Sequence, residues 1–439
     1  MSDARNAHNI RTVETVGIVG LGYVGLPLAA TFAEAGLSVV GVDNSASKVE
    51  ALNAGESYVQ DVSSAMLLDL VSSRKARFSQ EYEPLQEAEA VLICLPTPLD
   101  EYREPDLSIV VAGVEEISAN LRPGALVVLE STTYPGTTRE VVQPILEQNG
   151  RREIGDDFHL AFSPERVDPG NIGYNIKSTP KVVGGVTEGC AALAEELYAR
   201  VVNEVHVVSS PESAEMSKLL ENVFRGVNIA LVNELAILCH RMGIDVWEVV
   251  DAAKTKPFGF MPFYPGPGLG GHCIPVDPFY LSWRARAFDM STEFIELAGR
   301  TNVNMPYYAE SRVTSALNAE KKPVNGSRIL MLGVSYKPNV GDLRESPSLK
   351  ILELLARDGA DVAYHDPYVP ELPDNGLESV ELTEGQIEEA DCVVIATDHK
   401  VVDLEPVVAR ASKIVDLRNA VRNRLGAHSL EDLENVEIL

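Results

Sequence analysis

The sequence predicts an α/β protein with two doubly wound, parallel-sheet domains joined by a central long helix and a helical region. Three observations predict this fold class. Short apolar runs alternate with helical patterns over residues 13–208, a long apolar-periodic stretch without internal proline follows, and the alternation of strand and helix returns after residue 321. Strands that alternate with helices are typical of parallel sheets. Both sheet domains are therefore expected to be Rossmann-like.

The composition is that of a globular, acidic chain. With 439 residues, 45% hydrophobic and 23% charged, it can bury two or three cores at roughly 100 to 200 residues per domain. Its 65 Asp and Glu outnumber its 37 Lys and Arg, which gives a formal net charge of −28. Such a chain repels nucleic-acid phosphates and anionic lipid, so we expect no nucleic-acid partner and no membrane partner. A halophilic origin is a hypothesis that full stability in dilute buffer would contradict.

The cysteines predict neither a disulfide framework nor a metal site. There are five, far apart and without a CxxC pair: Cys94, Cys190, Cys239, Cys273 and Cys392. We expect reduced thiols, no metal and a cytoplasmic location. The opening segment MSDARNAHNIR also lacks the apolar core of a secretory signal.

The first structural element is a βαβ unit. In VGIVGLGYVGLPLAATFAEAGLSVVGVD, an apolar strand turns through glycines into an amphipathic helix, and a second strand ends at Asp43. The uncharged run 16–33 has the length of a membrane span, but its four glycines and one proline favour the βαβ interpretation. Further strands of a parallel sheet are predicted at 91–95, 126–129, 159–162 and 181–183.

The middle of the chain is predicted to be helical. Apolar positions at helical spacing indicate one long helix over 211–243, and helical patterns continue over 245–253 and 278–317. An all-helical middle often carries a dimer interface, so we expect a homodimer through the central helix.

The last third repeats the plan of the first. RILMLGVSY, DVAYHD, DCVVIATD and KIVDLRN indicate strands, and 347–358 indicates a helix. In both halves a strand runs into a glycine turn and a helix, and the next strand ends in an acid, Asp43 or Asp366. We interpret this as an internal duplication. The expected divisions are a tail (1–12), a first Rossmann-like domain (13–208), a central helical dimerisation domain (209–320) and a C-terminal Rossmann-like domain (321–439).

The first glycine turn predicts a dinucleotide site. Gly20, Gly22 and Gly25 match G-x-G-x-x-G, in which the glycines permit a tight turn, close approach of a pyrophosphate, and close helix packing. Asp43 lies 18 residues beyond Gly25, where a carboxylate binds the ribose hydroxyls of NAD and repels the 2′-phosphate of NADP. The alternative is a purely structural turn beside a solvated acid.

A glycine- and proline-rich loop, FYPGPGLGGHCIPVDP, surrounds Cys273. Such a loop suits close contact with a ligand, so a nucleophilic thiolate at Cys273 is one interpretation and an unreactive loop cysteine is the other. Asp277 is either a helix cap or a base that activates water. Lys218 and Asn222 share one helix face, where they could converge on an oxyanion or form a solvated stripe.

Hydroxyl groups follow a predicted strand in ESTTYPGTT, residues 130–138. They stand at the edge where ligands enter doubly wound sheets, although helix capping explains any one of them equally well.

Seven motifs occur in the order found in a known family: GLGYVGLPLA, LPTPLDEYREPDLS, ESTTYPGTT, SPERVDPGN, EMSKLLENVFRGVNIALVNE, PGPGLGGHCIPVDPFY and GVSYKPNVGDLRESPS. On these motifs the chain resembles the UDP-glucose/GDP-mannose dehydrogenase family over nearly its whole length. GGHCIPVDP and SPERVDPG are similar to the branch that acts on N-acetylated UDP-hexosamines.

The resemblance implies a four-electron oxidation, in which the C6 alcohol of the sugar becomes a carboxylate and two NAD⁺ are reduced in turn. It implies that Cys273 attacks the intermediate aldehyde to give a thiohemiacetal and then a thioester, which water hydrolyses. Lys218 and Asn222 would stabilise the negative oxygen, and Asp277 with Thr132 would hold or activate the water.

The resemblance also implies that 13–208 is the NAD-binding domain and 321–439 the UDP-sugar-binding domain, and it implies which residues bind the ligands. Cofactor-binding positions are Gly20, Gly22, Tyr23, Val24, Gly25, Asp43, Lys48, Thr97, Ser131, Thr132 and Arg344. Substrate-binding positions are Glu165, Arg166, Lys218, Asn222, Lys256, Tyr264, Gly268, Gly270, Lys337 and Arg418. Glu165 also matches a glutamate of the family's acid–base and hydrolysis machinery. Lys256 corresponds to an arginine that reaches across a dimer interface, although the loop here is one residue longer.

The identity of the sugar stays open. UDP-N-acetylglucosamine is the expected substrate, and UDP-N-acetylmannosamine differs from it only at C2 and needs the same UDP anchors. UDP-glucose comes third, because its dehydrogenases usually have a small residue where His272 stands. A non-enzymatic alternative is an inactive scaffold or sensor that binds NAD and UDP-sugar, against which Cys273, Lys218, Asn222 and Asp277 together argue.

Overall fold

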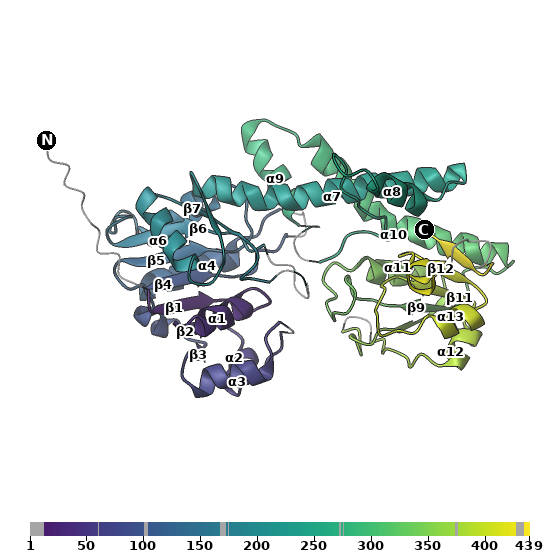
Figure 1. The fold of residues 1–439 in the computed structure, drawn as a ribbon, viewed down its shortest axis with the longest axis horizontal. Helices are drawn as coiled ribbons and strands as arrows, with labels where there is room; N and C mark the ends of the chain where they lie inside the picture. The colour runs from purple at the N-terminus through teal and green to yellow at the C-terminus, as the bar shows by residue number, and fades with distance from the viewer. Residues whose placement is uncertain are drawn as a thin grey trace. The chain divides into compact units, whose positions relative to one another are not determined.

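The structure is a computed structural model that describes residues 13–439, except 60, 101–103, 167–172, 174, 272–273, 275, 374–375 and 427–433. The chain divides into two compact units. Unit 1 comprises Met1–Glu221 with Trp283–Asp289, and unit 2 comprises Asn222–Ser282 with Met290–Leu439. One long helix, α7 (Pro211–Met242), is shared by both units (Figure 1).

Unit 1 contains an eight-stranded sheet in the order β3-β2-β1-β4-β5-β6-β7-β8. Its strands are β1 (Thr15–Val19), β2 (Ser38–Val42), β3 (Ala76–Ser79), β4 (Ala90–Ile93), β5 (Ala125–Leu129), β6 (Phe158–Phe162), β7 (Lys181–Gly185) and β8 (Val205–Val208). Neighbouring strands are parallel except for β6 and β7, which pair antiparallel. The expectation of a parallel strand at 181–183 was therefore wrong for its pairing with β6. Strand direction depends on the end of the sheet to which the chain returns, and a local apolar pattern does not contain that information.

Helices cover both faces of this sheet. They are α1 (Gly25–Glu34), α2 (Ala46–Asn53), α3 (Ser64–Ser72), α4 (Ser108–Asn120), α5 (Gln143–Leu146) and α6 (Glu188–Tyr198). Val16 and Ile18 of β1 pack with α1, α3 and α6 on one face, whereas Val19 packs with α4 and α5 on the other. This arrangement confirms the predicted doubly wound sheet.

The predicted long helix is confirmed as α7, within one residue of its predicted end. The next helix, α8 (Val246–Lys254), begins where the carboxylate of Asp245 accepts the backbone N–H groups of Trp247 and Glu248. The helix expected over 278–317 is divided into α9 (Asp277–Ala285), a short 3₁₀ turn (Arg286–Phe288) and α10 (Glu293–Ala319). Asp289 ends the turn with a left-handed backbone (φ +54°), which does not continue a helix.

Among the described residues, α7 alone is long and apolar enough to pass a test for a membrane span, with 33% of the tested window buried. A core helix passes the same test. Helix α7 also carries buried polar residues, among them Glu215, Lys218 and Asn222. The run 16–33 folds instead into β1, the glycine turn and α1.

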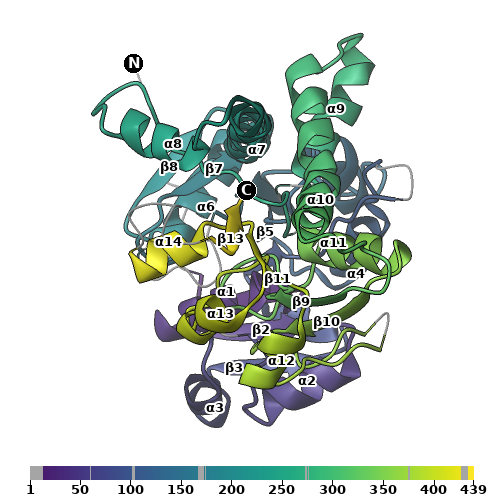
Figure 2. The ribbon, with the colours of Figure 1, turned by 90° about the vertical axis from the view of Figure 1, so that its right-hand side faces the viewer.

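Unit 2 contains a five-stranded parallel sheet in the order β10-β9-β11-β12-β13. Its strands are β9 (Arg328–Leu332), β10 (Asp361–His365), β11 (Cys392–Ile395), β12 (Ile414–Asp416) and β13 (Val436–Ile438), and its further helices are α11 (Pro347–Arg357), α12 (Glu384–Glu389), α13 (Glu405–Arg410) and α14 (Ala420–Leu425). Helices α10 and α11 pack on one face of the sheet, and α12, α13 and α14 pack on the other (Figure 2).

The two sheets share a hydrogen-bond pattern at corresponding strand ends, which is consistent with the predicted internal duplication. Asp43 at the end of β2 accepts the N–H of Leu21, and Asp366 at the end of β10 accepts the N–H of Val334. Each carboxylate also accepts the N–H two residues further along the chain. The halves differ in the next segment, because α1 begins five residues after Gly20, whereas α11 begins only at Pro347, after a loop over 333–346.

Candidate active site

The glycine turn of unit 1 has the shape that a dinucleotide needs. A Cβ on Gly25 would lie 1.8 Å from the carbonyl oxygen of Gly20, so only glycine permits this packing of α1 against β1. Gly20 itself has φ +91° and lies close to the backbone of Cys94. A Cβ on Gly22, by contrast, would meet nothing within 4 Å. The open space at Gly22 and the start of α1 three residues later fit the approach of a pyrophosphate.

Asp43 is placed where a ribose-binding carboxylate is expected. It is buried, and its two oxygens accept the N–H groups of Leu21 and Ser45, each at 3.0 Å. The ammonium of Lys48 lies 3.4 Å from Oδ2. Oδ1 accepts only the N–H of Ser45 among the described residues, so its second lone pair leaves Asp43 acceptor capacity for a ribose hydroxyl. Beyond the glycines, Val24 precedes the first residue of α1 and Tyr23 is exposed.

The predicted hydroxyl residues brace the loops after β4 and β5. Thr97 Oγ1 donates to the carbonyl oxygen of Thr132 at 2.7 Å, and Ser131 Oγ donates to that of Leu95 at 2.7 Å. These bonds join two neighbouring strand ends. Thr97, Ser131 and Thr132 therefore lie together at the carboxyl edge of the sheet, where ligands of doubly wound folds bind.

Lys218 and Glu165 meet in unit 1. Lys218 Nζ donates to the backbone carbonyl oxygen of Glu165 at 2.5 Å, and Lys218 is buried. This contact fixes the ammonium while leaving the Glu165 carboxylate for other partners. The carboxylate lies 3.6 Å from Lys181 Nζ.

Lys181 belongs to a buried polar group that the sequence analysis missed. Lys181 Nζ lies 2.6 Å from Glu130 Oε2, and Glu130 Oε1 accepts the hydroxyl of Tyr198. Burial raises the pKa of Glu130 more than Lys181 lowers it. Burial lowers the pKa of Lys181, but Glu130 and Glu165 outweigh that effect and raise it above its usual value. The only sequence signal was a lysine and a glutamate at the ends of apolar strands.

Arg166 is anchored next to Glu165. Its Nη1 donates to the carbonyl oxygen of Pro180 at 2.8 Å, and its Nη2 lies 2.7 Å from Glu221 on α7. In the described part of the chain, its buried Nε has no hydrogen-bond partner. The segment that follows Arg166 in SPERVDPG lies outside the described residues from 167 onward.

Asn222 and Asp277 meet in unit 2. Asn222 Nδ2 donates to Asp277 Oδ2, and both side chains are buried. Asp277 is the first residue of α9. Asp277 therefore lies at a helix start, as the helix-cap interpretation expected. It also orients the side-chain amide of Asn222, the group proposed to stabilise an oxyanion.

Cys273, on which the covalent chemistry depends, lies outside the described residues, as does His272. The glycines before them are close to another loop of unit 2. A Cβ on Gly270 would lie 2.5 Å from the Cβ of Tyr336, and the N–H of Gly271 donates to the carbonyl oxygen of Arg344 at 2.9 Å. Gly268 has φ +133° and faces Pro347. The glycines thus permit close approach of this chain's own backbone.

The proposed UDP anchors lie at strand ends of unit 2. Arg418 follows β12, and its Nε donates to the carbonyl oxygen of Ala396 at 2.8 Å. Burial lowers the pKa of Arg418 to about 10, although nearby aspartates oppose the shift. Lys337 is carried by the loop after β9, and Arg344 in the same loop pairs with Asp342 at 2.6 Å.

Two other predicted substrate residues follow α8. Lys256 is exposed, with its ammonium 5.0 Å from the ring centroid of Phe258. Tyr264 stacks on Trp247 with ring centroids 5.5 Å apart, and its hydroxyl donates to Asp251 at 2.6 Å.

The part of the chain that the structure describes carries no grouped metal ligands. There, no three or more His, Cys, Asp or Glu side chains are grouped to hold a metal ion. The four cysteines that the structure covers, Cys94, Cys190, Cys239 and Cys392, are free thiols.

Comparison with known proteins gives the family. Profiles of the UDP-glucose/GDP-mannose dehydrogenase family match in order: the NAD binding domain over residues 14–202, the central domain over 212–304 and the UDP binding domain over 330–423. The chain belongs to this family. It is therefore a nucleotide-sugar dehydrogenase with NAD as its cofactor.

Individual relatives of this dehydrogenase act on different sugars. It is 39% identical over 355 residues to the UDP-N-acetyl-D-glucosamine 6-dehydrogenase of Pseudomonas aeruginosa, covering 81% of this chain and 83% of the relative. It is 37% identical to the UDP-N-acetyl-D-mannosamine dehydrogenase of Pyrococcus horikoshii, covering 93% and 96%. Among solved structures, the UDP-D-ManNAc dehydrogenase of Pyrococcus horikoshii superposes with a TM-score of 0.85 at 35% identity, covering 92% and 96%.

Proposed function

We propose that this dehydrogenase converts UDP-N-acetylglucosamine into UDP-N-acetylglucosaminuronate. The C6 alcohol, two NAD⁺ and one water give the carboxylate, two NADH and three protons. Bound NAD⁺ supplies the hydride acceptor for each of the two oxidations. Gly20, Gly22 and Gly25 would hold its pyrophosphate, and Asp43 its ribose.

Cys273 is the proposed nucleophile. After the first oxidation, its thiolate attacks the C6 aldehyde, so that a C–S bond forms and the carbonyl oxygen becomes the alkoxide of a thiohemiacetal. Loss of a hydride from that carbon gives a thioester. Water then adds to the thioester carbonyl, the C–S bond breaks, and the thiolate and the carboxylic acid are released, the acid losing its proton at neutral pH.

The buried pairs Lys218–Glu165 and Asn222–Asp277 support this mechanism. The two donors, the ammonium of Lys218 and the amide of Asn222, lie one turn apart on α7. Each is held by a hydrogen bond to a residue from a distant segment of the chain. A fixed cation and a fixed amide stabilise an alkoxide better than mobile groups do, because no reorganisation is needed when the charge develops. Asp277 with Thr132, and the carboxylate of Glu165, are the proposed groups that hold water and move its proton.

The UDP moiety is proposed to bind unit 2. Lys337 and Arg418 supply local positive charge in a chain whose formal net charge is −28. Arg418 keeps a guanidinium near the ends of β11 and β12, where nucleotide ligands bind doubly wound sheets. Arg166, Lys256, Tyr264, Gly268 and Gly270 remain proposed substrate contacts.

A panel of nucleotide sugars tests the substrate. We expect the highest kcat/KM with UDP-N-acetylglucosamine and NAD⁺, measured as NADH formation. The second candidate is UDP-N-acetylmannosamine, because the relative of that name matches 93% of the chain. A higher kcat/KM with UDP-N-acetylmannosamine or UDP-glucose, or with NADP⁺ in place of NAD⁺, would contradict the assignment.

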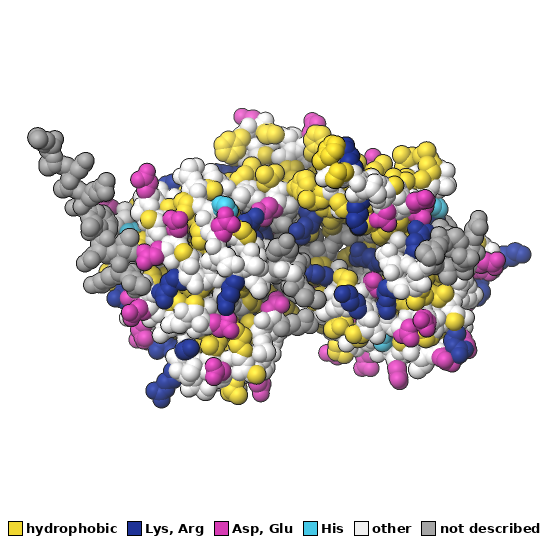
Figure 3. All heavy atoms as spheres, viewed as in Figure 1, with side chains coloured by type: hydrophobic (Ala, Val, Ile, Leu, Met, Phe, Trp, Pro, Cys, Tyr) yellow, Lys and Arg dark blue, Asp and Glu magenta, His cyan; other side chains and the backbone are white. Residues whose placement is uncertain are grey.

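We also propose that the enzyme is a cytoplasmic homodimer that pairs through α7. This helix exposes a stripe of large hydrophobic side chains: Leu220, Phe224, Leu231, Leu235, Leu238 and Met242. Their spacing of three, four or seven residues places them on one helix face. Figure 3 shows hydrophobic side chains gathered along the upper edge of the view, over α7 and α8. The same stripe on a second copy of the chain can pack against it, so that both apolar faces are buried in a two-fold dimer.

A further inference from the structure

The loop over 333–346 carries Lys337, the residue proposed to meet the diphosphate. Its counterpart in unit 1 passes from Gly20 to α1 within five residues. A longer loop has more conformations to lose when it binds a ligand, so its position depends on contacts with the rest of the unit. Among the described residues, one histidine and one aspartate supply four of these contacts, beside bonds that join the loop to Thr397, Lys400, His365 and Gly271.

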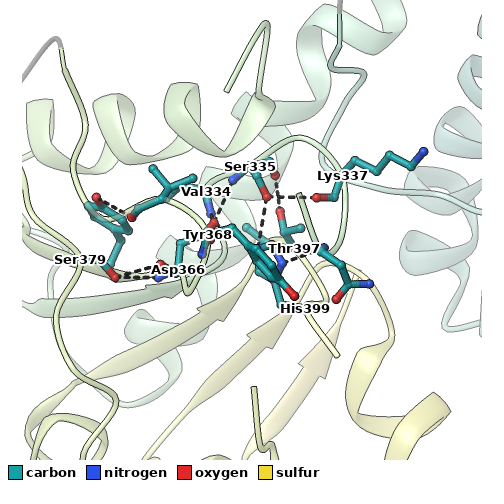
Figure 4. Close-up of polar contacts among 12 residues, drawn as sticks. Val334, Ser335, Lys337, Asp366, Tyr368, Ser379, Thr397 and His399 are labelled. Carbon is teal, nitrogen blue, oxygen red and sulfur yellow. Dashed lines mark hydrogen bonds and ion pairs between the residues drawn. The ribbon is translucent and has the colours of Figure 1, made fainter. Parts of the chain in front are cut away.

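His399 holds this loop on both sides of Lys337. The N–H of Asn339 donates to His399 Nδ1 at 2.9 Å, and His399 Nε2 lies 3.2 Å from Ser335 Oγ. Ser335 Oγ in turn donates to the backbone carbonyl oxygen of Lys337 at 3.0 Å. The imidazole is fully buried. Figure 4 shows the Lys337 side chain extending away from this network while its backbone is tied into it.

The partners of the ring define its tautomer. Nδ1 accepts a backbone N–H and therefore carries no hydrogen, so the hydrogen of the neutral ring is on Nε2. Nε2 faces both Asp366 Oδ2, at 3.1 Å, and Ser335 Oγ. A catalytic triad needs the acid and the hydroxyl on different ring nitrogens, so this arrangement does not activate the serine. The hydrogen bonds among Ser335, His399 and Asp366 instead hold the loop 333–346 in place.

Asp366 keeps the ring in this orientation. Its carboxylate accepts the N–H groups of Val334, Ser335 and Tyr368 at 2.8 to 3.1 Å. Burial raises the pKa of Asp366, but the hydrogen bonds from His399 and from Val334 outweigh burial and hold the pKa below its usual value. The ring of Tyr368 covers the imidazole, with centroids 5.1 Å apart.

We propose that His399, oriented by Asp366, is a positioning residue for nucleotide binding: it holds the segment 335–339 so that Lys337 is ready to bind a diphosphate. This inference rests on the proposed binding of UDP to unit 2. His399 acts through Lys337 and does not itself touch the ligand. Preorganising a binding group in this way reduces the entropy lost on association.

A double-mutant cycle on the full-length chain tests the proposal, with UDP as the probe in calorimetry. His399→Asn keeps an acceptor near the Nδ1 position and removes the donor at Nε2. We expect it to weaken UDP binding about tenfold, in line with the loss of one well-formed hydrogen bond. When Lys337 is already alanine, adding His399→Asn should weaken UDP binding only slightly further, because the ammonium that His399 positions is absent.

Three controls separate positioning from general damage. His206→Asn changes an exposed histidine and should leave UDP affinity unchanged. His399→Asn should leave the affinity for NAD⁺ unchanged, because Asp43 and the glycine turn lie in unit 1 and because Arg344, the predicted cofactor contact in this loop, pairs with Asp342 outside the segment 335–339. In turnover, KM for the nucleotide sugar should rise while kcat stays within about twofold, as expected when only binding is changed.

The possible results are distinct. Unchanged UDP affinity in His399→Asn, or costs that add fully with those of Lys337→Ala, would overturn the proposal. If Lys337→Ala alone leaves UDP affinity unchanged, the placement of UDP in the proposed function is wrong instead. Should His399→Asn fail to fold, Ser335→Ala removes the Oγ link alone; a UDP affinity that it leaves unchanged overturns the proposal, and weaker UDP binding with unchanged NAD⁺ binding supports it.

Discussion

At the scale of single residues, Glu130, Lys181 and Tyr198 form a buried polar group that borders the candidate catalytic residue Glu165. Lys181 is surrounded by two carboxylates, one of which belongs to the candidate catalytic residue Glu165. The two carboxylates offset the cost of burying the Lys181 ammonium. Removing Lys181 would leave both of them without this partner. Lys181 therefore links the core of unit 1 to the orientation of Glu165.

Lys181→Met should destabilise the protein by about 3–5 kcal/mol at pH 7, because it leaves buried carboxylates unpaired. The pKa of Glu130 is already raised, so its protonated form favours the folded state and its ionised form costs stability as the pH rises. Without Lys181 that pKa rises further, and the deficit should shrink between pH 7 and pH 5. Denaturant unfolding at both pH values measures it.

Lys177→Met is the matched control, since Lys177 is exposed and its ion pair with Glu34 is long, at 3.7 Å. It should change the free energy of unfolding by less than about 0.5 kcal/mol. A deficit for Lys181→Met that is equal at pH 7 and pH 5 would contradict the electrostatic explanation.

Residues that a local motif marks were predictable from the sequence, whereas pairs of residues from distant segments were not predictable from spacing alone. Asp43 was identified because glycine spacing and strand ends are local signals. Lys181 and Glu130 are 51 positions apart, and His399 and Asp366 are 33 apart. Pairing across such distances is decided by the order of the strands, which periodicity does not reveal.

At the scale of elements, the glycine turn separates packing from ligand binding. Gly22→Ala should leave the free energy of unfolding within about 0.5 kcal/mol of the parent, because the new methyl group meets nothing within 4 Å. The methyl group should nevertheless occupy the pyrophosphate path and weaken NAD⁺ binding by about tenfold or more. Calorimetry with NAD⁺ and denaturant unfolding measure both quantities.

Gly25→Ala is the informative contrast. Its methyl group would lie 1.8 Å from the Gly20 oxygen, so overpacking should destabilise the protein by about 1–3 kcal/mol. Full NAD⁺ affinity in Gly22→Ala would show that the pyrophosphate does not approach this turn.

Strongly periodic elements were predicted well. The long helix was predicted to within one residue, because its apolar spacing is regular and no proline interrupts it. The helix expected over 278–317 is broken at 286–292, where no glycine marks the break and Asp289 adopts a left-handed conformation. The direction of β7 relative to β6 was missed, because the pattern of a buried strand is the same in either direction.

At the scale of the whole molecule, the two sheet domains differ in how they hold the loop after their first strand. Unit 1 has a short glycine turn that leads directly into α1, which suits a dinucleotide pyrophosphate. Unit 2 has a longer loop, 333–346, which carries Lys337 and is hydrogen-bonded to Asp366 and His399.

The exposed face of α7 determines the expected assembly. In light scattering, the parent protein should have twice the mass of one chain. Replacing both Leu231 and Leu238 by Glu should give monomers, because charges would be buried in an apolar interface. Leu68→Glu changes an equally exposed leucine on α3 and should remain dimeric. A monomeric parent, or a dimer unaffected by the double change, would contradict the assignment of this face.

The measurement that tests the central claim most directly is the ratio of NADH formed to nucleotide-sugar acid produced in a single assay. Covalent oxidation through Cys273 predicts a ratio of two in the parent, and in Cys273→Ser a loss of acid formation with UDP binding retained. A ratio of one, with an aldehyde as the end product, or unchanged acid formation by Cys273→Ser, would contradict the account.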